Sequence, residues 1–200
     1  MRAPPARYRR RSAVVNNKPL LTAVSIAAAF FCNVASASAE ERVCRGTIGA
    51  VTLDNVRVPQ NASCTLKGTR VKGTVKVENN AVLRADDVNV IGNVQGENAR
   101  NVMVINGSRI GGSVQVVQGD RATVSDSRIS GSIQYDSNNM PLKILRNVVD
   151  EDVQVFQNTG GAEIRGNRID GNLQCKENRP PPTGRNNVVQ GNKEDQCKRL

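Results

Sequence analysis

The stretch Ile164-Arg165-Gly166-Asn167-Arg168-Ile169-Asp170-Gly171-Asn172-Leu173-Gln174 decides the fold, because near-copies of it recur along the chain. Each copy has a glycine-centred polar turn followed by an apolar-x-apolar segment such as Val114-Gln115-Val116. The central turn residue recurs every 19 or 20 residues, as Gly73, Gly92, Gly112, Gly131, Glu151, Gly171 and Gly191. A second apolar limb precedes that residue by seven positions, at Leu66, Ala85, Ile105, Val124, Ile144 and Ile164.

This repeat predicts short strands that stack as coils. The apolar spacing of two or four residues, with β-branched residues between polar turns, favours strands over helices. A coil of about 20 residues has room for two or three short strands, and stacking places equivalent residues about 4.8 Å apart. We therefore expect an all-β, single-domain parallel β-helix (solenoid) of about seven coils, with 19–20 residues per coil and right-handed winding.

Other repeat folds fit the period less well. A β-propeller blade needs four strands and about 40 residues, and leucine-rich repeats carry a Leu-x-x-Leu-x-Leu pattern that is missing from this sequence. A left-handed hexapeptide solenoid would keep a multiple of six residues per coil.

The pattern Ile-x-Gly-Asn-Arg-Ile-x-Gly-Asn-Leu-Gln resembles the repeats of right-handed parallel β-helix proteins. That superfamily includes pectate-lyase-like enzymes and many small exported bacterial proteins. The resemblance implies a fold and not an activity.

The first 39 residues have the three parts of a secretory signal peptide. A basic segment without acids is followed by an apolar run from Leu20 to Phe31 and by the small-x-small site Ala37-Ser38-Ala39. The apolar run is shorter than the ~20 residues that span a bilayer. We expect residues 1–39 to be removed, residues 40–200 to form the β-helix domain, and the product to be secreted or periplasmic without membrane association.

The charge and composition of residues 40–200 narrow the possible functions. These residues carry 22 basic and 18 acidic side chains, a net charge of +4, and no recognisable nucleic-acid motif, so no nucleic-acid partner is expected. The absence of histidine removes the commonest general base and metal ligand. We expect no metal and no cofactor.

The four remaining cysteines are spaced as coil neighbours. Cys44 and Cys64 are 20 residues apart and Cys175 and Cys197 are 22 apart, so stacking brings each pair within disulfide range. Crossed pairings would have to join opposite ends of the stack, and the Cys-x-x-Cys spacing of zinc sites is missing. We predict disulfides Cys44–Cys64 and Cys175–Cys197 that cap the two ends.

A row of glutamines is the first candidate for a binding site. One repeat position is occupied by Gln95, Gln115, Gln134, Gln154 and Gln174. The flanking apolar residues should be buried, so the row should lie on the outside of a sheet. Stacked amides can hydrogen-bond along such a column, which makes the row either a stabilising ladder or a binding face.

The best catalytic candidate is the carboxylate cluster Asp150-Glu151-Asp152, which replaces the usual turn sequence. The family resemblance would imply lyase or epimerase chemistry on acidic glycans. Polar turn residues are more commonly solvated, and the scarcity of aromatic residues (Tyr135 and Phe156 after residue 39) does not suit a sugar-processing enzyme. We therefore expect a monomeric, non-enzymatic binding or structural module whose partner is a polysaccharide or protein outside the cell or in its envelope. A self-assembling solenoid is a further alternative that the capped ends disfavour.

Overall fold

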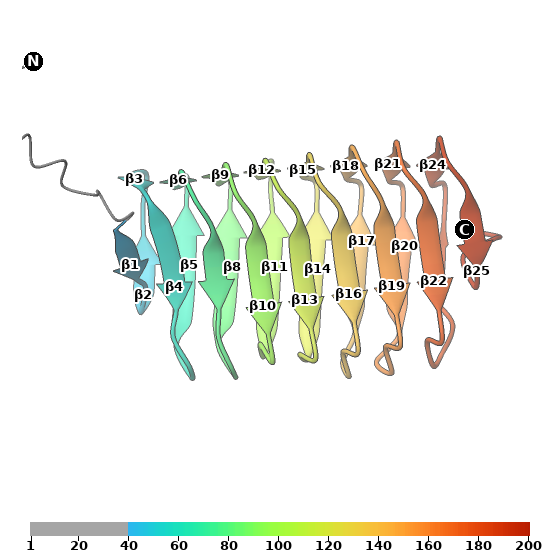
Figure 1. Cartoon of the computed structure of the whole chain (residues 1–200), viewed down its shortest axis with the longest axis horizontal. Helices are drawn as coiled ribbons and strands as arrows, with labels where there is room; N and C mark the ends of the chain where they lie inside the picture. Colours follow the sequence, from blue (N-terminus) through green and yellow to red (C-terminus); the bar gives the residue numbers. More distant parts are fainter. Residues whose placement is uncertain (1–39) are drawn as a thin grey trace, which may run out of the picture. The chain divides into compact units, whose positions relative to one another are not determined.

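Every repeat folds into three short strands, because its alternating apolar residues are separated by polar turns. The computed structural model describes residues 40–200, in which parallel coils are stacked along one axis (Figure 1). The predicted signal peptide lies outside the described residues. Three parallel sheets run the length of the stack, and each receives one strand from every coil.

We name the sheets A, B and C in the order in which the chain visits them. Sheet A contains nine strands: β1 (Glu41–Val43), β4 (Asn55–Val58), β7 (Val75–Val77), β10 (Val94–Glu97), β13 (Val114–Val117), β16 (Ile133–Asp136), β19 (Val153–Phe156), β22 (Leu173–Lys176) and β25 (Lys193–Asp195). Sheet B contains eight: β2 (Gly46–Ile48), β5 (Ser63–Lys67), β8 (Val82–Asp86), β11 (Asn101–Ile105), β14 (Arg121–Ser125), β17 (Leu142–Leu145), β20 (Ala162–Arg165) and β23 (Thr183–Arg185). Sheet C contains eight two-residue strands: β3 (Thr52–Leu53), β6 (Arg70–Val71), β9 (Asn89–Val90), β12 (Arg109–Ile110), β15 (Arg128–Ile129), β18 (Val148–Val149), β21 (Arg168–Ile169) and β24 (Val188–Val189).

The parallel solenoid is therefore confirmed, with about eight turns instead of about seven. The additional coil is formed by residues 41–53, whose exposed strands lack the apolar alternation of the later copies.

The prediction that Ile105 is the buried residue of its apolar limb is wrong by one position. Val104 takes the buried position beside Ala85 and Val124, while Ile105 lies beside Asp86. The turn after β11 holds one additional residue, Gly107, which shifts the seven-residue count by one.

The core is a column of aliphatic side chains enclosed by the three sheets. In sheet A, Val94 lies beside Val114, and Val114 beside Ile133, each with an exposed fraction of zero. Burying an aliphatic side chain of this size stabilises by about 1.5–3 kcal/mol, so every coil stabilises its neighbours and not itself alone.

Two ladders of buried asparagines complete the stack at the turns. Between sheets A and B, Asn158 Nδ2 donates to the Tyr135 carbonyl at 3.0 Å, and its Oδ1 accepts the Asn138 backbone N–H at 2.9 Å. The same pattern continues through Asn178, and a second ladder runs through Asn147, Asn167 and Asn187 between sheets B and C. These amides satisfy backbone groups that the turns would otherwise leave buried and unpaired.

The predicted disulfide pairings are both present. Cys44 is bonded to Cys64 and Cys175 to Cys197, with Cα–Cα distances of 5.6 and 5.3 Å. The first joins the initial coil to the second, and the other fixes the C-terminal turn against the last coils. Leu200 packs against the core from the same turn. Both bridges therefore lie at the ends of the stack, where unpaired strand edges fray most easily.

Candidate functional site

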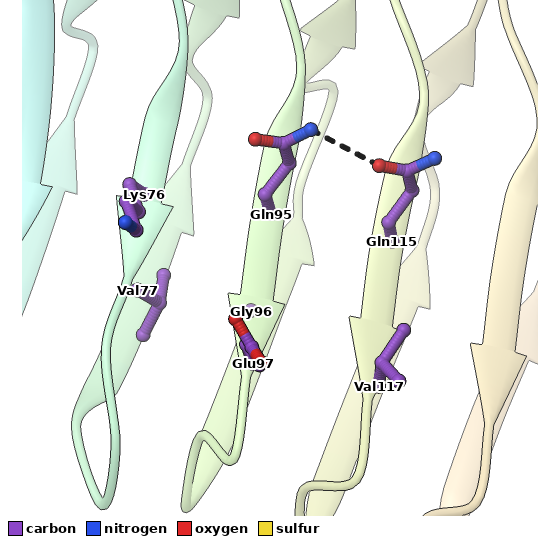
Figure 2. A pocket seen from close by; sticks show the side chains of 7 residues that line it. All are labelled: Lys76, Val77, Gln95, Gly96, Glu97, Gln115 and Val117. Carbon is purple, nitrogen blue, oxygen red and sulfur yellow. Dashed lines mark hydrogen bonds between the residues drawn. The ribbon is translucent and has the colours of Figure 1, made fainter.

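The five glutamines form one continuous hydrogen-bonded row on the outer face of sheet A. Each Nε2 donates to the Oε1 of the next coil, at 3.1 Å from Gln95 to Gln115, 2.7 Å to Gln134, 3.1 Å to Gln154 and 3.0 Å to Gln174. The first of these bonds is drawn in Figure 2. The strand alternation sets this geometry, because the residues on either side of each glutamine point into the core.

All the amides of the row point the same way, and each end of the row has a charged residue whose sign favours that direction. All the amides donate toward the C-terminal end, where Gln174 Nε2 donates to Glu194 Oε2 at 2.9 Å. At the other end Lys76 is the register neighbour of Gln95, on the side to which the first amide oxygen points (Figure 2). A cation at the oxygen end and a carboxylate at the N–H end both favour the observed orientation of the amide dipoles.

The ladder leaves half of each amide unused. A glutamine side chain has two N–H donors and two acceptor lone pairs. Gln115, Gln134 and Gln154 each donate one bond and accept one within the row. One donor and one acceptor per coil therefore remain for a ligand, at the spacing of the coils.

A second column of outward side chains lies beside the glutamine row and contains the apolar residues of this face. Val117 and Phe156 occupy this column, two residues after the glutamines of β13 and β19. Shallow depressions of about 390 Å³ each adjoin them, one lined by Gln95, Gln115 and Val117, the other by Phe156 and Lys176 (Figure 2 for the first). Phe156 is half-buried on this face, whereas Tyr135 is buried in the core.

The central part of this face carries only negative charge. The outward residues of β10, β13, β16 and β19 include Glu97 and Asp136 and no lysine or arginine. Basic side chains appear only toward the ends, at Arg57, Lys76 and Lys176. Arg57 is itself bonded to Glu41 at 2.7 Å, which raises the pKa of the guanidinium further. A polyanion would be repelled from the middle of sheet A, while a neutral polymer would not.

No known protein-family model matches the chain, and comparison with curated proteins and with solved structures gave no match.

The carboxylate cluster Asp150-Glu151-Asp152 is occupied by contacts to the neighbouring coils. Arg128 donates to both oxygens of Asp150 at 2.9 Å, and the Ser132 hydroxyl donates to Glu151 Oε2 at 3.0 Å. Asp152 Oδ1 accepts the Asn172 backbone N–H at 2.7 Å. The three side chains thus point to three different partners and do not converge on one point.

Among residues 40–200, no group of three or more His, Cys, Asp or Glu side chains is arranged to hold a metal ion. Nor does any helix in this range have the length and hydropathy needed to cross a bilayer.

Sequence reasoning located the glutamine row but missed the groups around it. Val117 and Phe156 follow the row by two residues, a spacing that places them on the same face of a strand. The asparagine ladders also have a sequence signal, since Asn138, Asn158 and Asn178 are 20 residues apart. That interval equals the coil length and could have identified them.

Proposed function

We propose that the chain is a non-enzymatic binding module that holds a neutral, extended polysaccharide along the outer face of sheet A. The observation that carries the proposal is the row of glutamine amides, each with a free donor and acceptor once per coil. Sugar hydroxyls both donate and accept hydrogen bonds, so they complement such a row. A protein partner would place backbone groups there instead, and such a protein would not be retarded by any neutral glycan.

The surroundings of the row support a glycan of low charge. Phe156 and Val117 provide apolar contacts beside the amides, of the kind that commonly line ligand sites. Glu97 and Asp136 disfavour anionic sugars in the central coils. Export of the module through the predicted signal peptide belongs to the same proposal, and the two disulfides are compatible with an extracellular environment.

A lyase or epimerase role has less support. The carboxylates of Asp150, Glu151 and Asp152 each have a structural partner in an adjacent coil. Acidic glycans would also be repelled from the centre of the glutamine face. If the protein released unsaturated uronates from polygalacturonate or alginate, and the triple substitution to alanine abolished that release, the non-enzymatic proposal would be wrong.

Affinity electrophoresis in gels containing xylan, galactomannan or hydroxyethylcellulose tests the binding proposal. We expect retardation by at least one of these neutral polymers, and we expect the variant Gln134→Ala/Gln154→Ala to lose most of it. The matched control is Gln60→Ala/Gln190→Ala, which removes two exposed glutamines outside the row. Equal retardation of the two variants, or no retardation of the unaltered protein by any neutral glycan, would refute the proposal.

A further inference from the structure

The outer face of sheet C carries a row of arginines. One outward position of its strands is occupied from β6 to β24 by Arg70, Asn89, Arg109, Arg128, Val148, Arg168 and Val188. All four arginines are exposed, and the position holds no acid in these seven coils. Sheet C forms the upper edge of the stack in Figure 1, whereas sheet A faces the viewer, so the arginine row and the glutamine row lie on different sides of the solenoid.

The arginines in the first half of this row have no carboxylate partner within residues 40–200, unlike those in the second half. Arg128 is bonded to Asp150 at 2.9 Å, and Arg168 lies 3.4 Å from Asp170. Among the described residues, Arg70 and Arg109 have no carboxylate within 4 Å. Asp86, at the adjoining corner, is already held by Asn106 and Arg84, which lower the pKa of its carboxyl.

The arrangement has no evident benefit for folding. Arg109 and Arg128 are register neighbours, and like charges directly opposite on adjacent strands are destabilising. On sheet A the comparable neighbours Arg57 and Lys76 are relieved by Glu41 and Glu78, which lie 2.7 and 3.6 Å from the Arg57 guanidinium. On sheet C Asp150 relieves Arg128 in the same way, whereas Arg70 and Arg109 hold no carboxylate of the described coils. These two exposed guanidinium groups are therefore free to bind an anionic ligand.

We propose that the outer face of sheet C binds a linear anionic glycan that carries sulfate or phosphate esters, through Arg70 and Arg109. The guanidinium fork matches such oxyanions with paired hydrogen bonds. The two side chains are aligned along the stack, with the coil of Asn89 between them. They therefore present charge along a line about 10 Å long. The site is separate from the glutamine face and does not depend on it.

Two other anionic partners fit this face less well. Single-stranded nucleic acid is usually held by aromatic side chains on which bases stack, and neither Tyr135 nor Phe156 lies on sheet C. An anionic bilayer is planar and would also meet Asp150 and Asp170, which point outward in the later coils of the same face. A narrow chain can follow the first coils and avoid those carboxylates.

Binding to dextran sulfate, with unsulfated dextran as the neutral control, tests the proposal. We expect binding to dextran sulfate alone, weakening as salt is added. The variant Arg70→Ser/Arg109→Ser should bind roughly tenfold more weakly. The control Arg100→Ser/Arg121→Ser removes two exposed arginines at the other edge of the solenoid and the same net charge, and it should retain binding within about twofold.

Several results would overturn the inference. Equal weakening by both variants would show that net charge and not the row attracts the polymer. Tighter binding to a single-stranded oligonucleotide or to phosphatidylglycerol vesicles than to dextran sulfate would identify a different partner. We also expect Arg70→Ser/Arg109→Ser to leave the unfolding temperature unchanged or raised, because a like-charged neighbour of Arg128 is removed. A fall in unfolding temperature would give the arginines the structural role that the proposal denies.

Discussion

Asp152 Oδ1 accepts the backbone N–H of Asn172 at 2.7 Å, one coil further along the stack. The same relationship recurs at this repeat position, where Asn55 accepts from Thr74, Asn93 from Ser113, and Asn172 from Asn192. The candidate catalytic carboxylate is therefore a member of a ladder of side-chain oxygens that hold the turns before sheet A. Asparagine, serine and threonine serve the same purpose in other coils.

Substitution of Asp152 should reveal this structural role. Asp152→Asn keeps an acceptor oxygen of the kind that Asn93 and Asn172 use, so we expect its free energy of unfolding to change by less than about 0.5 kcal/mol. Asp152→Ala leaves the Asn172 N–H without its partner and should cost about 1–2 kcal/mol. Urea denaturation measures both. If the asparagine variant lost as much stability as the alanine variant, the carboxylate charge and not the acceptor oxygen would be what the turn needs.

The buried asparagine ladder should be more sensitive than any surface amide. Asn158→Ala would leave the Tyr135 carbonyl and the Asn138 backbone N–H buried without their partners. We expect a loss of about 2–4 kcal/mol, since each orphaned buried group costs about 1–3 kcal/mol. The control Asn79→Ala removes an exposed asparagine from an earlier turn and should change stability by less than about 0.5 kcal/mol. Equal effects of the two substitutions would contradict the ladder.

Most of the fold could be predicted because apolar residues recur along the sequence at an interval equal to the coil length. Val94, Val114 and Ile133 recur at the coil length, and a parallel stack is the arrangement that buries all of them together. The same period placed Cys44 opposite Cys64. The predicted number of coils is one too small because residues 41–53 lie at an open end, where little apolar surface is buried and the repeat pattern is weak. In this segment only the spacing of Cys44 from Cys64 indicates a coil.

The candidate site could be predicted only in part. The glutamine row follows from strand alternation, but its direction depends on Glu194, which belongs to a decayed copy of the repeat. Asn158 was not singled out because asparagine is common in turns for local reasons as well, and a single turn residue does not show whether it is buried. The insertion of Gly107 shows a further limit, since one additional turn residue exchanges Ile105 for Val104 in the core.

The two disulfides should each stabilise their own end of the stack. Each closes a loop of about 20 residues, for which the chain-entropy model gives about 3 kcal/mol. We expect Cys175→Ser/Cys197→Ser to lower stability by about that amount and to increase amide hydrogen exchange in β22 and β25 before β1 and β4. Peptide mapping of the oxidised protein should recover the pairs Cys44–Cys64 and Cys175–Cys197. A Cys64–Cys175 peptide would be incompatible with the stacked coils.

Tyr135 offers a test of the core, because its hydroxyl is buried with no hydrogen-bond partner among the described residues. Tyr135→Phe removes the unsatisfied polar atom and keeps the ring, so we expect stability at neutral pH to be unchanged or raised by about 1 kcal/mol. Burial raises the pKa of the phenol far above its usual value near 10. Above about pH 10 the unfolded chain releases the Tyr135 proton and the folded chain retains it. The unaltered protein should therefore lose stability as the pH rises beyond that value. Tyr135→Phe should lack this part of the alkaline loss, and urea denaturation at neutral and alkaline pH measures both effects. A variant that is less stable by several kcal/mol at neutral pH would mean that the hydroxyl has a partner in solution, such as a buried water.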